Sequence, residues 1–333
     1  MTAATKMTGK IALEEHFATE DTLGDSAEYA APGAWSTLER RLRDVDTERL
    51  AQMDAHGIEL AILSLNAPGI QAMWDARHAI ACAQRANDAL ASAIARRPDR
   101  LAGFAALPMQ DPDAAIDELR RCVGTLGFKG ALVNGFSQAG DAETTVYLDD
   151  PRYEAFWGAV ASLNVPFYLH PRDPLPSRTP IYEGHPWLRG AAWAFGVETA
   201  THALRLMASG LFDRYPNLTV VLGHLGEGLP FNMWRIDHRI AKRSDGIPTK
   251  RPLADYLRNN FYLTTSGNFR TAALVDAMNV VGAGGIMFSV DYPFEECGEA
   301  AAWFDTADID GRDRLKIGRE NAAALFHLPV AAR

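Results

Sequence analysis

Cysteine is scarce in this sequence of 333 residues, which contains only Cys82, Cys122 and Cys297. The three are far apart and odd in number, and no pair has the CxxC spacing. Neither a disulfide framework nor a thiolate zinc site is therefore indicated. The same scarcity of cysteine favours a reducing, cytoplasmic setting.

Long apolar runs and clusters of basic residues are also missing. No stretch approaches the ~18 uninterrupted apolar residues of a transmembrane helix, and the N-terminus lacks the apolar segment of a signal peptide. Lys and Arg number 33 against 42 Asp and Glu, which gives a formal net charge of −9. We therefore expect no nucleic-acid partner and no membrane partner. A small anionic substrate held by a metal and one arginine remains compatible with this charge.

Short apolar runs rich in β-formers alternate with helical patterns along nearly the whole chain. The predicted strands lie near residues 10–14, 59–65, 101–107, 129–133, 166–170, 218–223, 261–265 and 286–290. The predicted helices cover residues 47–56, 75–97, 112–126, 153–163, 192–211, 229–242, 270–281 and 298–307. This alternation indicates βαβ units and a parallel sheet. Eight such units favour a (β/α)8 TIM barrel, with a doubly wound sheet as the alternative.

The barrel is expected to be a single catalytic domain over residues 9–333, preceded by a disordered extension at residues 1–8. Two predicted loops are long, namely residues 17–46 after the first strand and residues 171–191 after the fifth. In a barrel both loops lie on the catalytic face, so we expect them to cover the pocket as lids.

Polar side chains end four of the predicted strands. They are Glu14, His16, His170, His224 and Asp291. The carboxyl ends of the strands of a (β/α)8 barrel meet at one face and build its site. Glu14 and His16 are two residues apart, so both point to one face of an extended strand. Carboxylates and imidazoles that converge there predict a site for a hard or borderline divalent metal.

Simpler interpretations of these residues stay open at this point. A charged residue at a strand end is often just solvated, and a lone histidine such as His170 is often a packed core residue. Asp291 could be the N-cap of a following helix, although a carboxylate after an apolar strand is costly unless it is paired or metal-bound. Glu15 is expected to point outward, towards the helix layer or a neighbouring loop.

His224 begins a glycine-rich segment in which Glu227 lies three residues further on. A histidine oriented by a carboxylate is typical of a general base or acid, and a glycine-rich turn with an N-capping glutamate is the alternative. Arg235, in the following helix, is a candidate for the pocket of its own or a neighbouring subunit. His185, in the second long loop, is a further candidate. Both of these residues are more often surface side chains.

Several motifs of the chain resemble the decarboxylase branch of the amidohydrolase superfamily (the amidohydrolase-2 or aminocarboxymuconate-semialdehyde-decarboxylase-like branch). The motifs are IALEEH (Ile11–His16), LVNG (Leu132–Gly135), YLHPR (Tyr168–Arg172), GHLGE (Gly223–Glu227) and FSVDYPF (Phe288–Phe294). The resemblance runs from Gly9 to about Leu328, and its combined motifs are specific. Within the branch it is nearest to enzymes that act on γ-resorcylate (2,6-dihydroxybenzoate). Hydrolytic members of the superfamily usually open with His-x-His, so Glu14 favours the decarboxylases.

The resemblance implies one divalent metal ion per subunit, with Mn²⁺ favoured, Zn²⁺ next, and no organic cofactor. The implied ligands are Glu14, His16, His170 and Asp291. His224 and Glu227 match the family's catalytic pair, which manages the phenolic proton, and Asp291 is the candidate acid for the ring carbon. Arg235 matches an arginine that reaches the neighbouring subunit's pocket in relatives. Phe294 matches an aromatic that packs on the substrate, and Tyr29 replaces a pocket phenylalanine.

The activity implied by the resemblance is the reversible nonoxidative decarboxylation of an ortho-hydroxybenzoate, with 2,6-dihydroxybenzoate as the leading substrate. Such an enzyme is a metal-dependent carboxy-lyase, and a homodimer or homotetramer is expected. The alternative substrates are 2,3-dihydroxybenzoate, salicylate and 5-carboxyvanillate. Two other classes also remain, a metal-dependent hydrolase of a lactone or amide and a non-catalytic barrel that serves as a scaffold.

Overall fold

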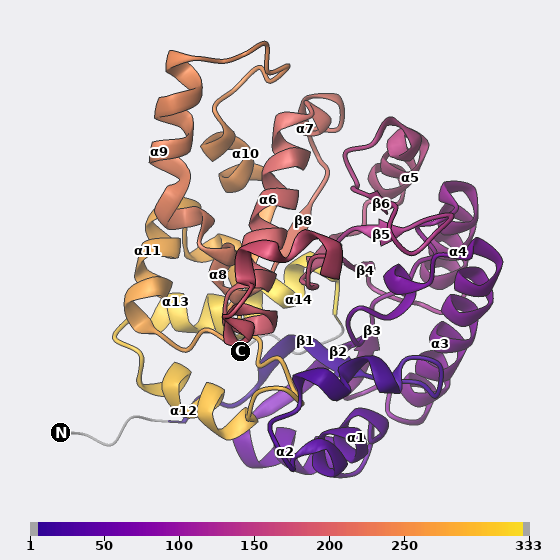
Figure 1. The fold of residues 1–333 in the computed structure, drawn as a ribbon. Helices are drawn as coiled ribbons and strands as arrows, with labels where there is room; N and C mark the ends of the chain where they lie inside the picture. Colours follow the sequence, from indigo (N-terminus) through magenta and orange to yellow (C-terminus); the bar gives the residue numbers. More distant parts are fainter. Residues whose placement is uncertain (1–5, 329–333) are drawn as a thin grey trace.

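Parallel strands surround the centre of the computed structural model, which describes residues 6–328 (Figure 1). They are β1 (Lys10–Phe17), β2 (Ile58–Leu65), β3 (Leu101–Gly103), β4 (Ala131–Asn134), β7 (Phe167–His170), β8 (Val220–Leu222), β9 (Phe261–Thr264) and β10 (Ile286–Met287). The pairing follows the chain, with β1-β2-β3 in one run and β4-β7-β8-β9-β10 in the other. A parallel bridge between Ala105 and Ala131 joins the two runs. This sequential order is that of the predicted (β/α)8 barrel, not of a doubly wound sheet.

The seam between β10 and β1 has no backbone ladder in the part of the chain that the structure describes. The Ser289 hydroxyl, just after β10, instead accepts a hydrogen bond from the Glu14 N–H at 2.8 Å. The His16 N–H donates to the Tyr292 carbonyl at 2.6 Å. The segment after β10 therefore closes the barrel against β1, and this segment carries Asp291.

The outer helices confirm the predicted alternation (Figure 1). They are α2 (Glu48–His56), α3 (Ala76–Arg96), α4 (Pro112–Gly124), α5 (Glu154–Leu163), α6 (Ala194–Ala208), α9 (Leu229–Lys242), α11 (Thr271–Val281) and α12 (Cys297–Thr306). The start of α4 shows why these segments become helical there. The Asp111 carboxylate accepts the N–H groups of Asp113 and Ala114, and Pro112 occupies the first turn, where its missing N–H costs nothing.

Several smaller elements were not predicted from the sequence. The helices among them are α1 (Trp35–Arg43), α7 (Leu211–Arg214), α8 (His224–Glu227), α10 (Leu253–Asn260), α13 (Gly311–Leu315) and α14 (Asn321–Leu325). A small hairpin consists of β5 (Ser137–Gln138) and β6 (Thr145–Val146). The short 3-10 helices are η1 (Leu23–Tyr29), η2 (Gly69–Ala72), η3 (Pro151–Tyr153), η4 (Pro176–Arg178), η5 (Pro180–Tyr182), η6 (Pro186–Leu188), η7 (Gly190–Ala192) and η8 (Ala283–Gly285), and η9 (Lys316–Glu320) is a π-helical turn. Most are short, so their hydrophobic period is too brief to detect.

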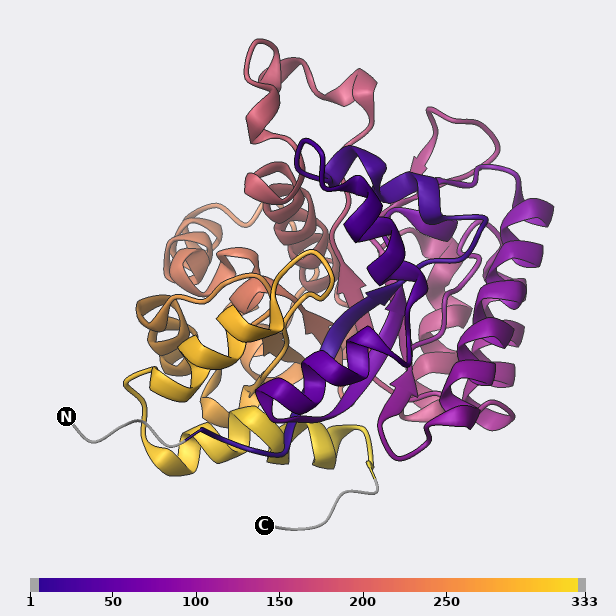
Figure 2. The ribbon, with the colours of Figure 1, turned by 90° about the horizontal axis from the view of Figure 1, so that it is seen from below.

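A cluster of apolar side chains fills the barrel interior below the catalytic face. Its members on the strands, or next to them in the case of Phe104, are Ile11, Leu13, Leu60, Ile62, Ala102, Phe104, Leu132, Tyr168, Val221 and Met287. From the C-terminal segment, Phe326 packs against Phe104 with ring centroids 5.4 Å apart. Helix α14 accordingly lies at the end of the barrel opposite the long loops (Figure 2). Among the described residues, this core fills the lower part of the barrel interior, so a site is expected at the carboxyl ends of the strands.

A β-bulge in β1 decides which side chains reach that site. Ile11 and Leu13 point into the barrel, so strict alternation would send Glu15 inward next. The pairing with β2 instead shifts between Ala12 and Glu15, which oppose Ala61 and Leu63. The extra residue reverses the alternation. Glu14 and His16 face the interior as predicted, but because of the bulge and not because of their spacing alone.

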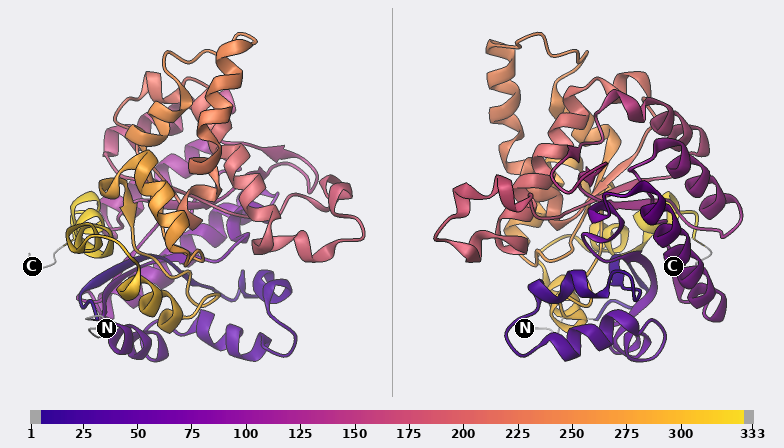
Figure 3. Two further views of the ribbon diagram at one scale, coloured as in Figure 1. Left: turned by 90° about the vertical axis from the view of Figure 1, so that its left-hand side faces the viewer. Right: turned by 45° about the vertical axis from the view of Figure 1, so that its right-hand side comes forward.

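The two long loops lie next to each other at the carboxyl ends of the strands (Figure 2). Residues 17–46 contain η1 and α1, and residues 171–191 contain η4 to η7. The second loop projects outward from the rest of the molecule (Figure 3). Because the second loop projects outward, residues 17–46 contribute much more to the pocket at this end of the barrel than residues 171–191 do.

The N-terminal segment attaches to the barrel before residue 9. Part of the predicted extension, residues 1–5, lies outside the described residues. The Met7 N–H, however, donates to Asp305 Oδ1 at 3.2 Å, and the Met7 side chain packs against the core. Within residues 6–328, we find no helix that is long and apolar enough to cross a membrane.

Candidate metal centre and active site

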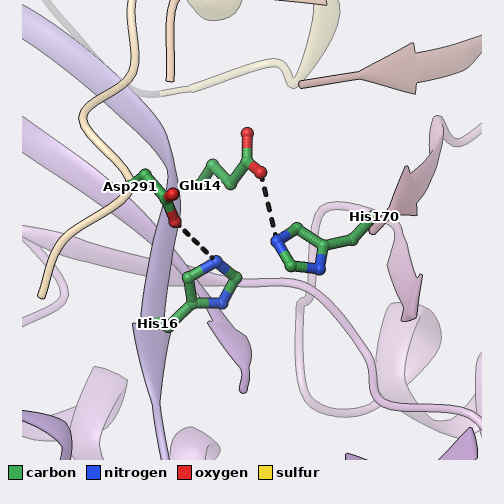
Figure 4. Close-up of side chains that lie close together, drawn as sticks. All are labelled: Glu14, His16, His170 and Asp291. Atoms are coloured by element: carbon green, nitrogen blue, oxygen red, sulfur yellow. Dashed lines mark ion pairs between the residues drawn. The ribbon is translucent and has the colours of Figure 1, made fainter. Parts of the chain in front are cut away.

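Four side chains from the first, fifth and eighth strand ends converge at the top of the barrel (Figure 4). They are Glu14, His16, His170 and Asp291, and their ligand atoms all lie within 4.8 Å of one another. His170 Nε2 lies 3.2 Å from Glu14 Oε1, and His16 Nε2 lies 3.2 Å from Asp291 Oδ1. The structure therefore brings together all four predicted ligands.

This donor set fits a divalent cation. Glu14 Oε1 and His16 Nε2 are buried and have no hydrogen-bond partner. Buried polar atoms are rarely left unsatisfied, so such atoms at the centre of a cluster indicate a missing partner. Two imidazoles and two carboxylates suit Mn²⁺ or Zn²⁺. The Ser64 hydroxyl lies 3.2 Å from His16 Nδ1 and orients this ring from behind.

The second carboxylate oxygen of Glu14 is held by the barrel wall. Glu14 Oε2 accepts hydrogen bonds from the hydroxyls of Tyr168, Ser266 and Thr264, the last at 3.2 Å. Burial alone would raise the pKa of Glu14, but the nearby His224 charge and the adjacent His170 imidazole lower it below its usual value. Glu14 is therefore an oriented anion, as a metal ligand must be.

His224 and Glu227 form the predicted pair, on a left-handed turn. The φ angles of His224, Leu225 and Glu227 are 53°, 57° and 56°, and two glycines complete the turn. Glycine is required at 223 for another reason, since a Cβ there would lie 2.8 Å from Glu14 Oε2. The turn places His224 Nδ1 2.7 Å from Glu227 Oε1. Glu227 thus orients the imidazole and does not act as a helix cap.

His224 lies beside the four-residue cluster without belonging to it. Its Nε2 atom is 3.7 Å from Asp291 Oδ2 and 3.9 Å from Glu14 Oε1. Burial would lower the pKa of His224, but the carboxylates of Glu227 and Glu14 raise it well above its usual value. A protonated imidazole that faces Asp291 can exchange a proton with it or with a bound substrate.

Asp291 has an unusual backbone conformation for an aspartate. Its φ angle is 80°, in the left-handed region that favours glycine. Burial would raise the pKa of Asp291, but the neighbouring imidazoles of His16 and His224 lower it. The next helix, α12, begins only at Cys297 with Glu296 before it, so the N-cap interpretation of Asp291 is excluded. The strained backbone is the mark of a functional position.

A cavity of about 360 Å³ opens above the cluster. Its walls are Tyr29, Ala30, Ala31, Ala34, Thr37, Leu38, Arg41, Ala67, His170, Ala191, Phe195, His224, Asp291, Pro293, Phe294, Glu295 and Glu296. The predicted pocket aromatics Tyr29 and Phe294 are both there. Phe294 packs edge-on against His16 at 5.7 Å, and Tyr29 against Phe195 at 5.3 Å. Aromatic walls over a metal site suit a flat ring bearing a carboxylate.

Two of the predicted substrate residues lie outside this cavity. His185 is exposed on the projecting loop, where its ring packs against Trp187 at 5.2 Å. Arg235 is exposed on α9 and does not line the cavity of its own chain. Because residues 171–191 project outward, His185 lies away from the cavity. Arg235 lies on a side of α9 that faces solvent in the single chain.

Sequence reasoning missed the residues that hold the ligands in place. Tyr168 lies two residues before His170, so the two share a strand face. Thr264 and Ser266 have the same spacing at the end of β9. Their period of two could have indicated this polar wall. Nothing local to the sequence indicated Phe195, which reaches the pocket from the start of α6.

Glu15 was expected to point outward, towards the helix layer or a neighbouring loop, and it points into the seam of the barrel, against the loop that follows β10. The side chain is 3% exposed. Burial raises its pKa to about 8, against the effect of hydrogen bonds from the backbone of Val290 and Tyr292. No sequence pattern revealed these partners, which lie across the seam.

Comparison with known families agrees with this geometry. Residues 48–328 match the family model described as Amidohydrolase. A γ-resorcylate decarboxylase of Rhizobium sp. (strain MTP-10005) is 59% identical over 327 residues, which are 98% of this chain and 100% of the relative.

Solved structures of decarboxylases also superpose closely on this chain. A 2,6-dihydroxybenzoate decarboxylase complexed with 2,6-dihydroxybenzoate superposes with a TM-score of 0.95 at 59% identity, covering 97% of this chain and 100% of that one. A dihydroxybenzoic acid decarboxylase from Polaromonas sp. JS666, with bound manganese and the inhibitor 2-nitroresorcinol, has a TM-score of 0.95 at 57% identity, with 98% of both chains covered.

Proposed function

The chain belongs to the amidohydrolase family, and from this premise we propose that it is a metal-dependent carboxy-lyase. The proposed reaction is the reversible nonoxidative decarboxylation of 2,6-dihydroxybenzoate (γ-resorcylate) to resorcinol and CO2. The observation that carries this proposal is the cluster of Glu14, His16, His170 and Asp291 under an aromatic cavity, in a chain 59% identical to γ-resorcylate decarboxylases.

We propose that the cluster holds one divalent ion per subunit, Mn²⁺ in preference to Zn²⁺. The unsatisfied Glu14 Oε1 and His16 Nε2 atoms and the manganese bound in the Polaromonas relative support this choice. When bound, such an ion acts as a Lewis acid and template for the substrate carboxylate and the neighbouring phenolic oxygen. The organic chemistry needs no further cofactor.

The chain's own residues then move the protons. His224, held by Glu227, starts protonated and passes its proton to Asp291 across the 3.7 Å that separate Nε2 from the carboxylate, and Asp291 delivers it to the ring carbon that bears the carboxylate. The neutral imidazole then takes the proton that the phenolic hydroxyl gives up. The bond to the carboxylate breaks, its electron pair returns to the ring, CO2 leaves, and the phenolate takes a proton from solvent to give resorcinol. Phe294 and Tyr29 hold the ring and exclude water.

Incubation of the Mn²⁺-loaded protein with 2,6-dihydroxybenzoate is expected to yield resorcinol and CO2 in equal amounts. At high bicarbonate, resorcinol is expected to be carboxylated. Chromatography and CO2 release measure both directions, and protein stripped of metal is the control. A panel of 2,3-dihydroxybenzoate, salicylate and 5-carboxyvanillate tests the alternatives. Hydrolysis of a lactone or amide without CO2 release would contradict the proposal.

We also propose that the chain works as a homodimer or homotetramer, with Arg235 reaching the neighbouring subunit's pocket. Large apolar side chains are exposed on α9 and near the projecting loop, which supports a partner surface. They are Trp187 at 65%, Trp193 at 58%, Phe231 at 81% and Trp234 at 73%. A groove of about 900 Å³ between α6 and α9 runs from this surface to His224 and Glu227.

Mixed oligomers test the role of Arg235. Arg235→Ala and Asp291→Asn are each expected to be inactive alone. When the two chains are refolded together in equal amounts, about a quarter of the sites of a two-fold dimer should combine an intact pocket with an intact partner arginine. Recovery of activity on that scale is expected, measured as resorcinol formation. No recovery in oligomers shown to be mixed would contradict a role across the interface.

We further propose that the barrel is one catalytic domain, with residues 17–46 and 171–191 as its lids, and that it acts in the cytoplasm. Residues of the first loop form much of the cavity wall, which supports its role as a lid. The three cysteines are unpaired and buried, as in proteins of reducing compartments.

A further inference from the structure

The Glu15 carboxylate bridges the seam between β10 and β1, which has no backbone ladder in the described residues. Glu15 Oε1 accepts the Val290 N–H at 3.0 Å and the Ser289 hydroxyl at 3.3 Å. Glu15 Oε2 accepts the Tyr292 N–H at 3.3 Å. All three donors lie on the segment after β10, whereas Glu15 itself lies on β1. The Glu15 side chain therefore takes the place of a backbone ladder between β1 and the segment that follows β10.

The two N–H groups held by Glu15 flank Asp291 on either side. Asp291 has a φ angle of 80°, a conformation that a residue other than glycine keeps only when its surroundings impose it. With its neighbours fixed on both sides, the Asp291 side chain is directed towards His16 Nε2 at 3.2 Å. The carboxylate of Glu15 therefore holds the backbone on both sides of Asp291, the residue with the strained φ angle.

Strand β1, which carries Glu15, also carries two of the four side chains of the metal cluster. Because of the bulge, Glu14 and His16 point into the barrel, whereas Glu15 points into the seam. Glu15 thus connects the strand that carries two of the candidate ligands with the segment that carries Asp291. Arg49 supports this arrangement, since its guanidinium donates to the His16 carbonyl and lies 4.7 Å from the centre of the Tyr292 ring.

We propose that Glu15 is a positioning residue for the metal centre, which holds the backbone of Asp291 in register with Glu14 and His16. This inference rests on the proposed role of Asp291 as a metal ligand. It does not depend on the identity of the substrate. Residues that orient metal ligands typically contribute ~10- to 100-fold to metal affinity.

Binding of Mn²⁺ to the full-length, metal-stripped protein tests this role without substrate. Free Mn²⁺ gives an electron paramagnetic resonance signal that disappears on binding, so a titration yields Kd. Glu15→Gln keeps one acceptor oxygen but turns an NH2 group towards a backbone donor. It is expected to weaken Mn²⁺ binding about tenfold, and Glu15→Ala nearer 100-fold. If Glu15→Ala fails to fold, Glu15→Gln remains the test.

Glu118 provides a matched control, because it is an equally buried glutamate (3% exposed) on α4, hydrogen-bonded to Asn87 and Arg121. Glu118→Gln is expected to lower Tm without changing the Kd of Mn²⁺. If Glu15→Gln binds Mn²⁺ as wild type does, or no more weakly than Glu118→Gln, the proposal is overturned. Loss of stability alone then accounts for Glu15.

A double-mutant cycle shows whether Glu15 acts through Asp291. In the Asp291→Ala background, Glu15→Gln is expected to cause no further loss of Mn²⁺ affinity, because the ligand that it positions is absent. A tenfold loss in both backgrounds would overturn the proposal. Absence of decarboxylase activity in the wild type would refute the proposed function and leave this result unchanged.

Discussion

Replacement of Asp291 by asparagine is expected to lower kcat for 2,6-dihydroxybenzoate on the order of 10³-fold, since a positioned general acid contributes ~10²–10⁴-fold. Asparagine has nearly the same size and keeps an oxygen that can face His16. It cannot carry a proton to the ring carbon. The variant is therefore expected to fold and to bind Mn²⁺ while losing turnover. The measurement is the kcat of the Mn²⁺-loaded variant, together with its metal content and Tm.

A second aspartate separates this effect from a general cost of removing a carboxylate. Asp213 accepts a hydrogen bond from the Tyr256 hydroxyl at 2.6 Å on α7, away from the cluster. Asp213→Asn is expected to keep kcat within about twofold, because substitutions remote from the site act mainly on stability. A rate like that of the wild type for Asp291→Asn would refute the role of Asp291 as the acid. A loss of rate that merely follows loss of Mn²⁺ would reduce Asp291 to a ligand.

The fold could be predicted because its signals are local and repeated. Each barrel strand is a short run of apolar β-formers, and each outer helix is long enough to show its period, as with α3 between β2 and β3. Polar residues such as His170 stand out after an apolar strand because burial makes them costly. The positions of the metal ligands were visible for the same reason.

The local geometry of the site was less visible, because tertiary contacts decide it. The bulge in β1 depends on pairing with β2, which no single strand reveals. The left-handed turn at His224 and Leu225 opposes intrinsic preference by about 1–2 kcal/mol per residue, so no propensity predicts it. The seam partners of Glu15 lie more than 270 residues away in sequence. The pairing between segments distant in the sequence therefore determines the direction of these side chains, which the motifs alone do not determine.

The long loops show a different limit. Their length predicted lids, and the first loop does line the cavity with Tyr29 and α1. The second loop projects outward, taking His185 with it (Figure 3). The course of such a loop is set by what it packs against, including any neighbouring subunit. Trp187 on this loop and Trp234 on α9 are exposed, and the proposed oligomer would bury such apolar side chains.

Replacement of His224 by alanine is expected to lower kcat on the order of 10²-fold while the content of Mn²⁺ stays unchanged. The four-ligand cluster does not include His224, and the shortest of its distances to the two carboxylate ligands is 3.7 Å. Loss of the imidazole removes the group that takes up the phenolic proton but leaves Glu14, His16, His170 and Asp291 in place. Resorcinol formation and elemental analysis of the same preparation measure the two effects separately.

A second variant, Glu227→Gln, is expected to have a milder effect than His224→Ala. Glutamine can still hydrogen-bond His224 Nδ1 over the 2.7 Å that separate the two groups, but it no longer supplies the charge that raises the pKa of the imidazole. A smaller loss, about tenfold, is expected together with a shift of the pH profile of kcat, since burial then lowers the pKa of His224 unopposed by Glu227. Loss of Mn²⁺ in His224→Ala would instead make His224 a fifth ligand. Wild-type activity of both variants would leave the phenolic proton to Asp291 alone.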